Sequence, residues 1–129
     1  MRLAELSWAE AQRVLERTDT VILPVGSTEQ HGPHCPLGTD HVTADAVANM
    51  VGDRAGLPVL PVVPVGVSSH HRQFHGTLWA PPAVFRDYVK AVILSAASHG
   101  PGCSGSNHTG RTNTACRSGH TGSDATGKD

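Results

Sequence analysis

Helical and extended patterns of apolar residues alternate along residues 1–100. Residues 8–17, 41–54 and 81–99 carry apolar side chains at the three- to four-residue spacing of a helix. Between them lie two short apolar runs, 20–26 and 58–67, whose β-branched content is typical of strands buried in a parallel sheet. This order of elements predicts an α/β fold, in which a mainly parallel sheet forms the middle of three α/β/α layers.

Local signals predict where these elements begin. Residues 7–10, SWAE, form a capping-box sequence before the first helix, and Thr39 or Asp40 is expected to cap the second. The two prolines at 81–82 favour the start of the third helix. Because proline cannot donate a backbone hydrogen bond, the prolines within 58–67 favour an edge position or a twisted segment for that strand.

The composition changes abruptly at residue 101. Residues 101–129 contain no Val, Ile, Leu, Met, Phe, Trp or Tyr. Such a segment buries too little apolar surface to offset the entropy lost on ordering it. We therefore predict one α/β domain over residues 1–100, incomplete at its C-terminal end, and a disordered segment over 101–129. A truncated or out-of-frame coding sequence is expected to produce this pattern.

Charge and cysteine content exclude several kinds of partner. Ten basic and eleven acidic residues give a net charge of −1, so no basic surface for nucleic acid is expected. The three cysteines form no CxxC pair, which favours a reducing compartment over a disulfide framework. Neither a membrane span nor the apolar core of a signal peptide is found. These features predict a cytoplasmic protein without a membrane or nucleic-acid partner.

The stretch GSTEQHGPHCPLGTD, residues 26–40, concentrates metal-binding side chains directly after the first apolar run. Glu29 and His31 are two residues apart, so they point to the same side of an extended chain. The intervening glycines and prolines allow Asp40 to fold back towards them. Carboxylates beside an imidazole suit zinc, manganese or ferrous iron. The alternative is that these are ordinary loop residues and that Asp40 only caps a helix.

Two longer stretches carry a family resemblance. LPVGSTEQHGPHCPLGTD, residues 23–40, resembles the signature of the creatininase (creatinine amidohydrolase) family, and VPVGVSSHHRQFHGTLW, residues 63–79, is similar to its second block. The resemblance covers roughly residues 1–100. It implies an α/β/α fold, one or two divalent ions (Zn, Fe(II) or Mn), hydrolysis of a non-peptide C–N bond, and a homo-oligomer in intact relatives. The wording HRQFHGTLW also resembles the archaeal-type formamide hydrolase (deformylase) branch.

The resemblance also implies roles for individual residues. The family's first three metal ligands, of which the aspartate bridges two ions, correspond to Glu29, His31 and Asp40. The histidine of the second block corresponds to His71, which is expected to contact the substrate, with an ordinary loop histidine as the alternative. Its neighbour His70 is expected at the surface. A later family motif supplies a further histidine ligand, and only His108 echoes it here.

These observations predict a metal-dependent amidohydrolase. Its substrate is expected to be a small-molecule amide, either a cyclic amide such as creatinine or a formamide of a pyrimidine nucleotide precursor. A metal-bound water is the expected nucleophile, and no residue is assigned as the catalytic acid. Because the sequence after residue 100 departs from the family pattern, the activity of this chain is expected to be impaired. The alternative is a non-catalytic remnant that binds metal weakly.

Overall fold

The computed structural model describes residues 1–101. Three α-helices, α1 (Trp8–Leu15), α2 (Thr39–Ala55) and α3 (Pro82–Ala97), are joined by extended segments and two 3-10 turns, η1 (Leu3–Glu5) and η2 (Ser69–His71). The three predicted helices are confirmed, with small differences at their ends. Beyond Pro101, the segment predicted to be disordered lies outside the described residues.

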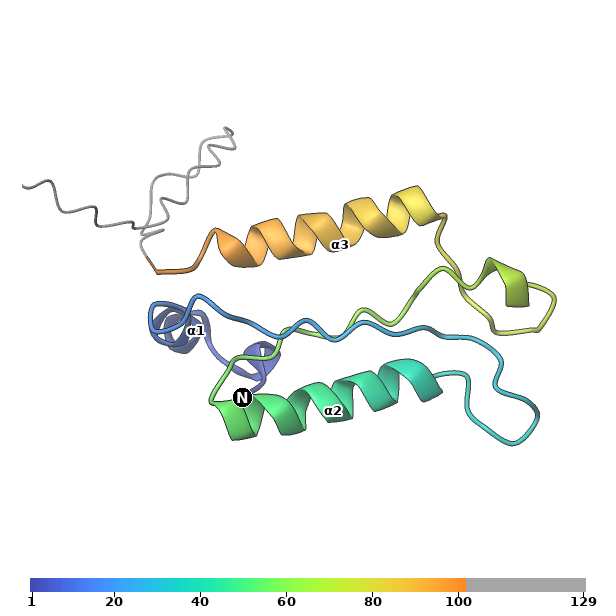
Figure 1. The fold of residues 1–129 in the computed structure, drawn as a ribbon, viewed down its shortest axis with the longest axis horizontal. Coiled ribbons are helices and arrows are strands. Elements are labelled where there is room, and N and C mark those ends of the chain that lie inside the picture. Colours follow the sequence, from blue (N-terminus) through green and yellow to red (C-terminus); the bar gives the residue numbers. More distant parts are fainter. Residues whose placement is uncertain (102–129) are drawn as a thin grey trace, which may run out of the picture.

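The two apolar runs lie side by side between α2 and α3 (Figure 1). They run parallel, because Ile22 pairs with Val59 and Val25 pairs with Val63. Each pairing is an isolated bridge, and no continuous strand forms in residues 1–101. The α/β class is therefore confirmed, while the predicted parallel sheet is reduced here to a pair of bridged extended segments covered by helices.

Prolines account for the interrupted pairing. The Leu60 N–H donates to the Ile22 carbonyl at 2.8 Å, and the Val63 N–H donates to the Pro24 carbonyl at 3.0 Å. Between and beside these donors, three residues of the second run have no N–H to offer, namely Pro58, Pro61 and Pro64. A regular ladder cannot pass through these positions.

The expected edge position of the second run is wrong at Val59. This residue forms parallel bridges with Ile22 on one side and with Arg2 on the other. Its N–H donates to the Met1 carbonyl at 2.9 Å, and its carbonyl accepts from the Leu3 N–H at 2.8 Å. The N-terminal residues thus take the outer position, and Val59 is almost completely buried.

The core is small and centres on the second apolar run. Its buried apolar side chains are Leu15, Ala48, Val59, Leu60 and Val63. Helix α3 contributes no buried residue.

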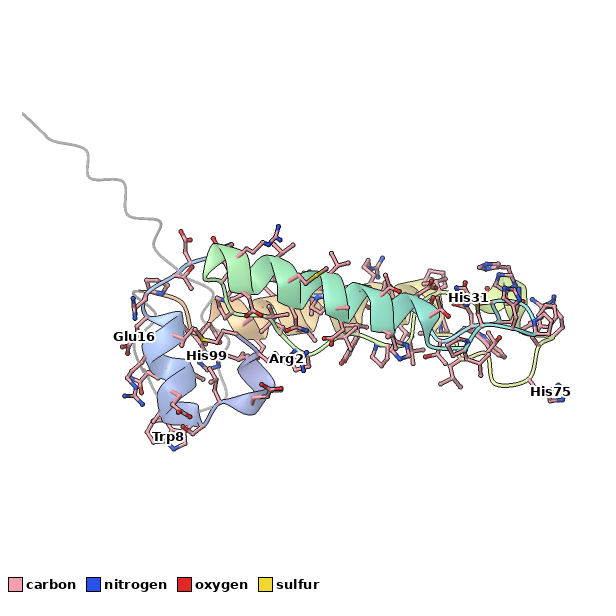
Figure 2. The ribbon with its side chains drawn as sticks, turned by 90° about the horizontal axis from the view of Figure 1, so that it is seen from below. Arg2, Trp8, Glu16, His31, His75 and His99 are labelled. Carbon is pink, nitrogen blue, oxygen red and sulfur yellow. The ribbon has the colours of Figure 1, made fainter. Side chains whose placement is uncertain are left out.

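A largely apolar cavity of about 510 Å³ lies where the C-terminal ends of α1 and α3 approach each other. His31 lies near the opposite end of the molecule from Glu16 and His99 (Figure 2). Within residues 1–101, no helix has the length and apolar character needed to cross a bilayer.

The helix starts differ in how well the sequence predicts them. Ser7 caps α1 as expected, because its N–H donates to the Glu10 carboxylate at 2.8 Å and its hydroxyl accepts from the Glu10 N–H at 3.4 Å. The predicted cap of α2 is wrong. Gly38 takes the N-cap position, and Thr39 and Asp40 are the first helical residues. The Asp40 carboxylate is therefore not used for capping.

Gly26 determines how closely the first apolar run approaches α2. A Cβ atom at this position would lie 2.5 Å from His41 Cα and 2.6 Å from His41 N. Both are backbone atoms in the first turn of α2, so neither can rotate away. Glycine is therefore required for this close approach.

We predict that Gly26→Ala destabilises the fold by about 1–3 kcal/mol, the usual cost of overpacking a tight contact. The midpoint of urea denaturation measures the loss. Gly100→Ala is the control, because a Cβ there would meet only the Ala97 carbonyl oxygen at 3.6 Å. Equal midpoints for the two variants would contradict this account of the packing.

Candidate metal centre

Three side chains from one stretch converge where the first apolar run meets α2. One ligand atom from each lies within 4.8 Å of the other two, in the group Glu29, His31 and Asp40. The loop between them closes because the Glu29 N–H donates to the Leu37 carbonyl at 2.9 Å. Gly32 turns the chain with a φ of 74°, which favours glycine. These contacts return Asp40 to the side of His31.

His31 is oriented at both ring nitrogens. Its Nδ1 lies 3.0 Å from the backbone carbonyl oxygen of Glu29, and its Nε2 lies 3.0 Å from Asp40 Oδ1. A carbonyl oxygen only accepts hydrogen bonds, so Nδ1 carries a proton. This leaves Nε2 as the nitrogen that binds an ion once its proton is lost. Metal-binding histidines usually donate their other N–H in this way.

The charges of this pair are stabilised by their neighbours. Two contacts lower the pKa of Asp40. The hydrogen bond donated by the Ser27 hydroxyl has the larger effect, and the contact with His31 has the smaller one. Two contacts raise the pKa of His31. The hydrogen bond to the Glu29 backbone carbonyl has the larger effect, and the contact with the Asp40 carboxylate has the smaller one. At a pH below the raised pKa of His31, a carboxylate thus faces an imidazolium. An ion bound here would replace the proton on His31 Nε2.

These shifts define the pH window in which the pair stabilises the fold. The raised pKa of His31 contributes stability that is complete below its ordinary pKa of about 6.5 and is lost as pH rises through the raised value. The lowered pKa of Asp40 contributes stability that is complete above its ordinary pKa of about 3.9 and is lost as pH falls through the lowered value. The pair is therefore strongest between about pH 4 and 6.5.

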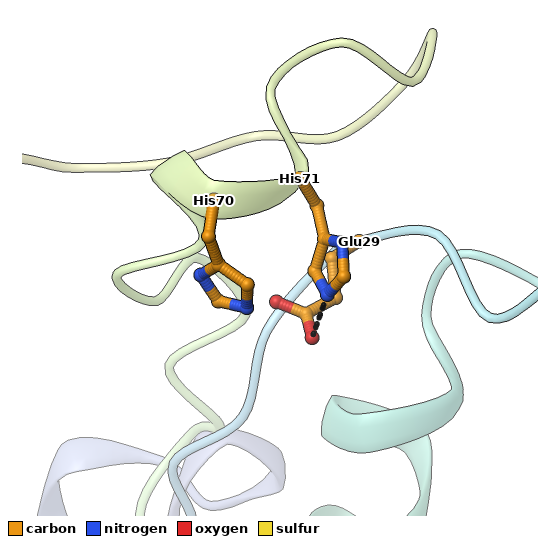
Figure 3. A group of neighbouring side chains, drawn as sticks. All are labelled: Glu29, His70 and His71. Atoms are coloured by element: carbon orange, nitrogen blue, oxygen red, sulfur yellow. Dashed lines mark ion pairs between the residues drawn. The ribbon is translucent and has the colours of Figure 1, made fainter.

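A second group shares Glu29. The Glu29 carboxylate lies 3.9 Å from His71 Nε2, and His70 completes a set of ligand atoms within 4.8 Å (Figure 3). His70 is exposed, as expected, but its ring lies beside that of His71 with centroids 4.1 Å apart. The two histidines come from η2, so the second block reaches the site through this turn.

Two residues that organise these groups are not predicted from the sequence. Ser27 donates to Asp40, and the Gln30 amide nitrogen lies 3.1 Å from His71 Nδ1. The alternating positions 27, 29 and 31 share one side of an extended chain, which is a signal that finds Ser27. Nothing in the spacing identifies Gln30. His108 lies outside the described residues, so its ligand role stays a prediction.

The donor set of the first group fits a divalent transition ion. Two carboxylates and one imidazole are ligands that Zn²⁺, Mn²⁺ and Fe²⁺ accept. The imidazole of His31 has the tautomer that metal binding needs, and a hydroxyl hydrogen-bonds the Asp40 carboxylate. The metal roles of Glu29, His31 and Asp40 remain predictions, and the geometry is compatible with them.

Known proteins resemble the chain over its N-terminal part. The sequence profile described as "Creatininase: Creatinine amidohydrolase" matches residues 4–103. A mycofactocin precursor peptide peptidase from Mycolicibacterium smegmatis is 50% identical over 64 residues, which cover 45% of this chain and 26% of that protein. A creatinine amidohydrolase from Pseudomonas putida is 33% identical over 104 residues, covering 76% of this chain and 40% of that protein. The chain thus spans less than half the length of these curated relatives.

Solved structures share the fold. The crystal structure of creatinine amidohydrolase (creatininase) superposes with a TM-score of 0.72 and 33% identity, covering 77% of this chain and 40% of that chain. A structure described as "Creatininase Mn" gives a TM-score of 0.72 at 31% identity, covering 78% and 41%. A mutant creatininase of Zn-Zn type gives 0.71 at 31% identity, covering 76% and 40%. The last two are metal-bound forms.

We predict that Asp40→Asn lowers the pKa of His31, because the variant removes the negative charge and weakens the hydrogen bond at Nε2. An NMR titration of the His31 ring protons measures the change. Asp87→Asn is the control, because Asp87 pairs with Arg86 on α3. An unchanged His31 pKa in Asp40→Asn would show that the two side chains do not interact in solution.

We also predict that Asp40→Ala weakens the binding of Zn²⁺ or Mn²⁺ by about 10- to 100-fold, the usual cost of losing a ligand or its support. His34→Ala is the matched control, because His34 is exposed and belongs to neither group. Titration calorimetry of the full chain compares the two variants. Equal losses of affinity would refute the ligand assignment.

Proposed function

Because the chain belongs to the creatininase (creatinine amidohydrolase) family, we propose that it is a metal-dependent amidohydrolase that cleaves a C–N bond. The observation that carries this proposal is the convergence of Glu29, His31 and Asp40, with ligand atoms within 4.8 Å of one another. The metal-bound forms of the solved relatives support it.

Each residue of the site has a separate task. Glu29, His31 and Asp40 would hold the ion. A bound divalent ion supplies Lewis acidity, which polarises an amide carbonyl and lowers the pKa of a water molecule. Ser27 holds Asp40 ionised, and the Glu29 carbonyl orients the His31 ring. His71 would contact the substrate, since its Nε2 lies 3.9 Å from the Glu29 carboxylate.

The substrate class follows from the family and its site. We propose a small cyclic amide such as creatinine, or a formamide of a pyrimidine nucleotide precursor. A peptide bond is a second candidate, favoured by the 50% identity to a mycofactocin precursor peptide peptidase. All three substrates present a carbonyl carbon bonded to nitrogen, which is the group that a Lewis-acid centre activates.

We further propose that turnover by this chain is slow. Its three described ligands come from one stretch of 12 residues, 29–40. Within residues 1–101, the other candidate ligands near this group are the half-buried His71 and the exposed His70. The loss of one well-placed ligand or its support commonly costs 10- to 100-fold in metal affinity or activity. Weak metal binding without turnover is the alternative.

The experiment compares hydrolysis of creatinine, a formamide and a short peptide by the chain with and without Mn²⁺ or Zn²⁺. We expect slow hydrolysis of at least one of them, lost on chelation and restored by the metal. Asp40→Ala should abolish it, whereas His34→Ala should keep it. Hydrolysis that survives both chelation and Asp40→Ala would overturn the proposal. Metal binding without any turnover would establish the non-catalytic alternative instead.

A further inference from the structure

His71 lies in a contact that determines which of its ring nitrogens carries the proton. Its Nδ1 faces the Gln30 side chain, with the amide nitrogen 3.1 Å away. Its Nε2 faces the Glu29 carboxylate at 3.9 Å, as Figure 3 shows. Distance alone makes this ring a candidate ligand together with His70. The hydrogen bonds of the His71 ring argue against a role as metal ligand.

The orientation of the Gln30 amide is determined by the backbone. The Gly32 N–H lies 3.0 Å from the Gln30 side chain, and an N–H only donates. The atom that accepts from it must be the amide oxygen, because the amide nitrogen has no acceptor capacity. The amide nitrogen is therefore the atom that faces His71 Nδ1.

This orientation assigns the tautomer of His71. The Gln30 nitrogen donates, so His71 Nδ1 accepts and carries no proton in the neutral ring. The proton is then on Nε2, which points towards the Glu29 carboxylate. A protonated nitrogen has no lone pair for a metal ion.

His31 has the opposite arrangement. Its Nδ1 donates to the backbone carbonyl of Glu29, which leaves the Nε2 lone pair for an ion. The two imidazoles on either side of Glu29 thus present different chemistry. His31 presents a ligand nitrogen, and His71 presents an N–H donor.

We propose that Gln30 is a positioning residue that holds His71 as its Nε2–H tautomer, so that His71 serves the site as a hydrogen-bond donor beside Glu29 and not as a metal ligand. The inference deepens the proposed function, since it takes Glu29, His31 and Asp40 as the ion-binding group. An N–H at this place attracts the Glu29 carboxylate 3.9 Å away and can donate a hydrogen bond to a substrate oxygen. Within residues 1–101, His70 and Glu29 are then the only remaining candidate ligands of that second group.

The test is ¹⁵N NMR of the histidine rings in the metal-free full chain, recorded at alkaline pH where the ring signals no longer change with pH. The ring signals that disappear in His71→Asn identify His71. We expect His71 Nε2 to be protonated and Nδ1 to be unprotonated in the natural sequence. An Nδ1-protonated His71 overturns the proposal without any variant at Gln30.

Gln30→Glu provides a matched second measurement. A carboxylate has nearly the shape of the amide and still accepts from the Gly32 N–H, but it cannot donate to His71. We expect the proton pattern of the ring to switch, so that Nδ1 becomes protonated, because the side chain at position 30 then only accepts. Gln73→Glu adds the same charge at an exposed position after η2 and should leave the tautomer unchanged.

A switch in Gln30→Glu and none in Gln73→Glu supports the assignment, and an unchanged His71 in Gln30→Glu refutes the role of Gln30. Because the measurement is made without metal, its outcome does not depend on whether the chain binds an ion. Metal titration of the same samples reports on the proposed function separately.

Discussion

The close approach of Gly26 to the first turn of α2 is the constraint on which the site depends. Gly26 is tied by its N–H to the Val63 carbonyl at 2.9 Å, and a side chain in its place would overlap the His41 backbone. One glycine thus joins the two extended segments and α2. Asp40 precedes His41, and Glu29 follows Gly26 by three residues of extended chain. The separation of the Glu29 and Asp40 carboxylates therefore depends on the contact between Gly26 and the His41 backbone.

Around that contact, the site is organised by hydrogen bonds that select a state for each ionisable group. Ser27 favours the ionised form of Asp40 and lowers its pKa. The carbonyl of Glu29 places the proton of His31 on Nδ1. Gln30 performs the reverse task at His71. None of these three groups, a hydroxyl, a backbone carbonyl and a side-chain amide, is among the candidate ligand atoms, yet together they determine which atoms an ion or a substrate meets.

The sequence predicted the helices well because their apolar spacing and the SWAE capping box are local signals. It predicted the grouping of Glu29, His31 and Asp40 because alternate positions share a side and the family signature covers this stretch. It failed at the cap of α2, where Gly38 takes the position and no side chain forms a capping hydrogen bond. It also failed at the edge position of Val59, which depends on how distant segments meet. Gln30 escaped notice for the same reason, because its partner lies 41 positions along the chain.

X-ray absorption spectroscopy of the Zn²⁺-loaded chain counts the imidazoles bound to the ion, and so reports which histidines are ligands. We expect His31→Asn to remove one imidazole from the coordination shell. We also expect His71→Asn to leave the number of bound imidazoles unchanged, since the His71 ring presents an N–H to Glu29. An imidazole lost in His71→Asn, or a shell unaltered in His31→Asn, would contradict this assignment of the ligands.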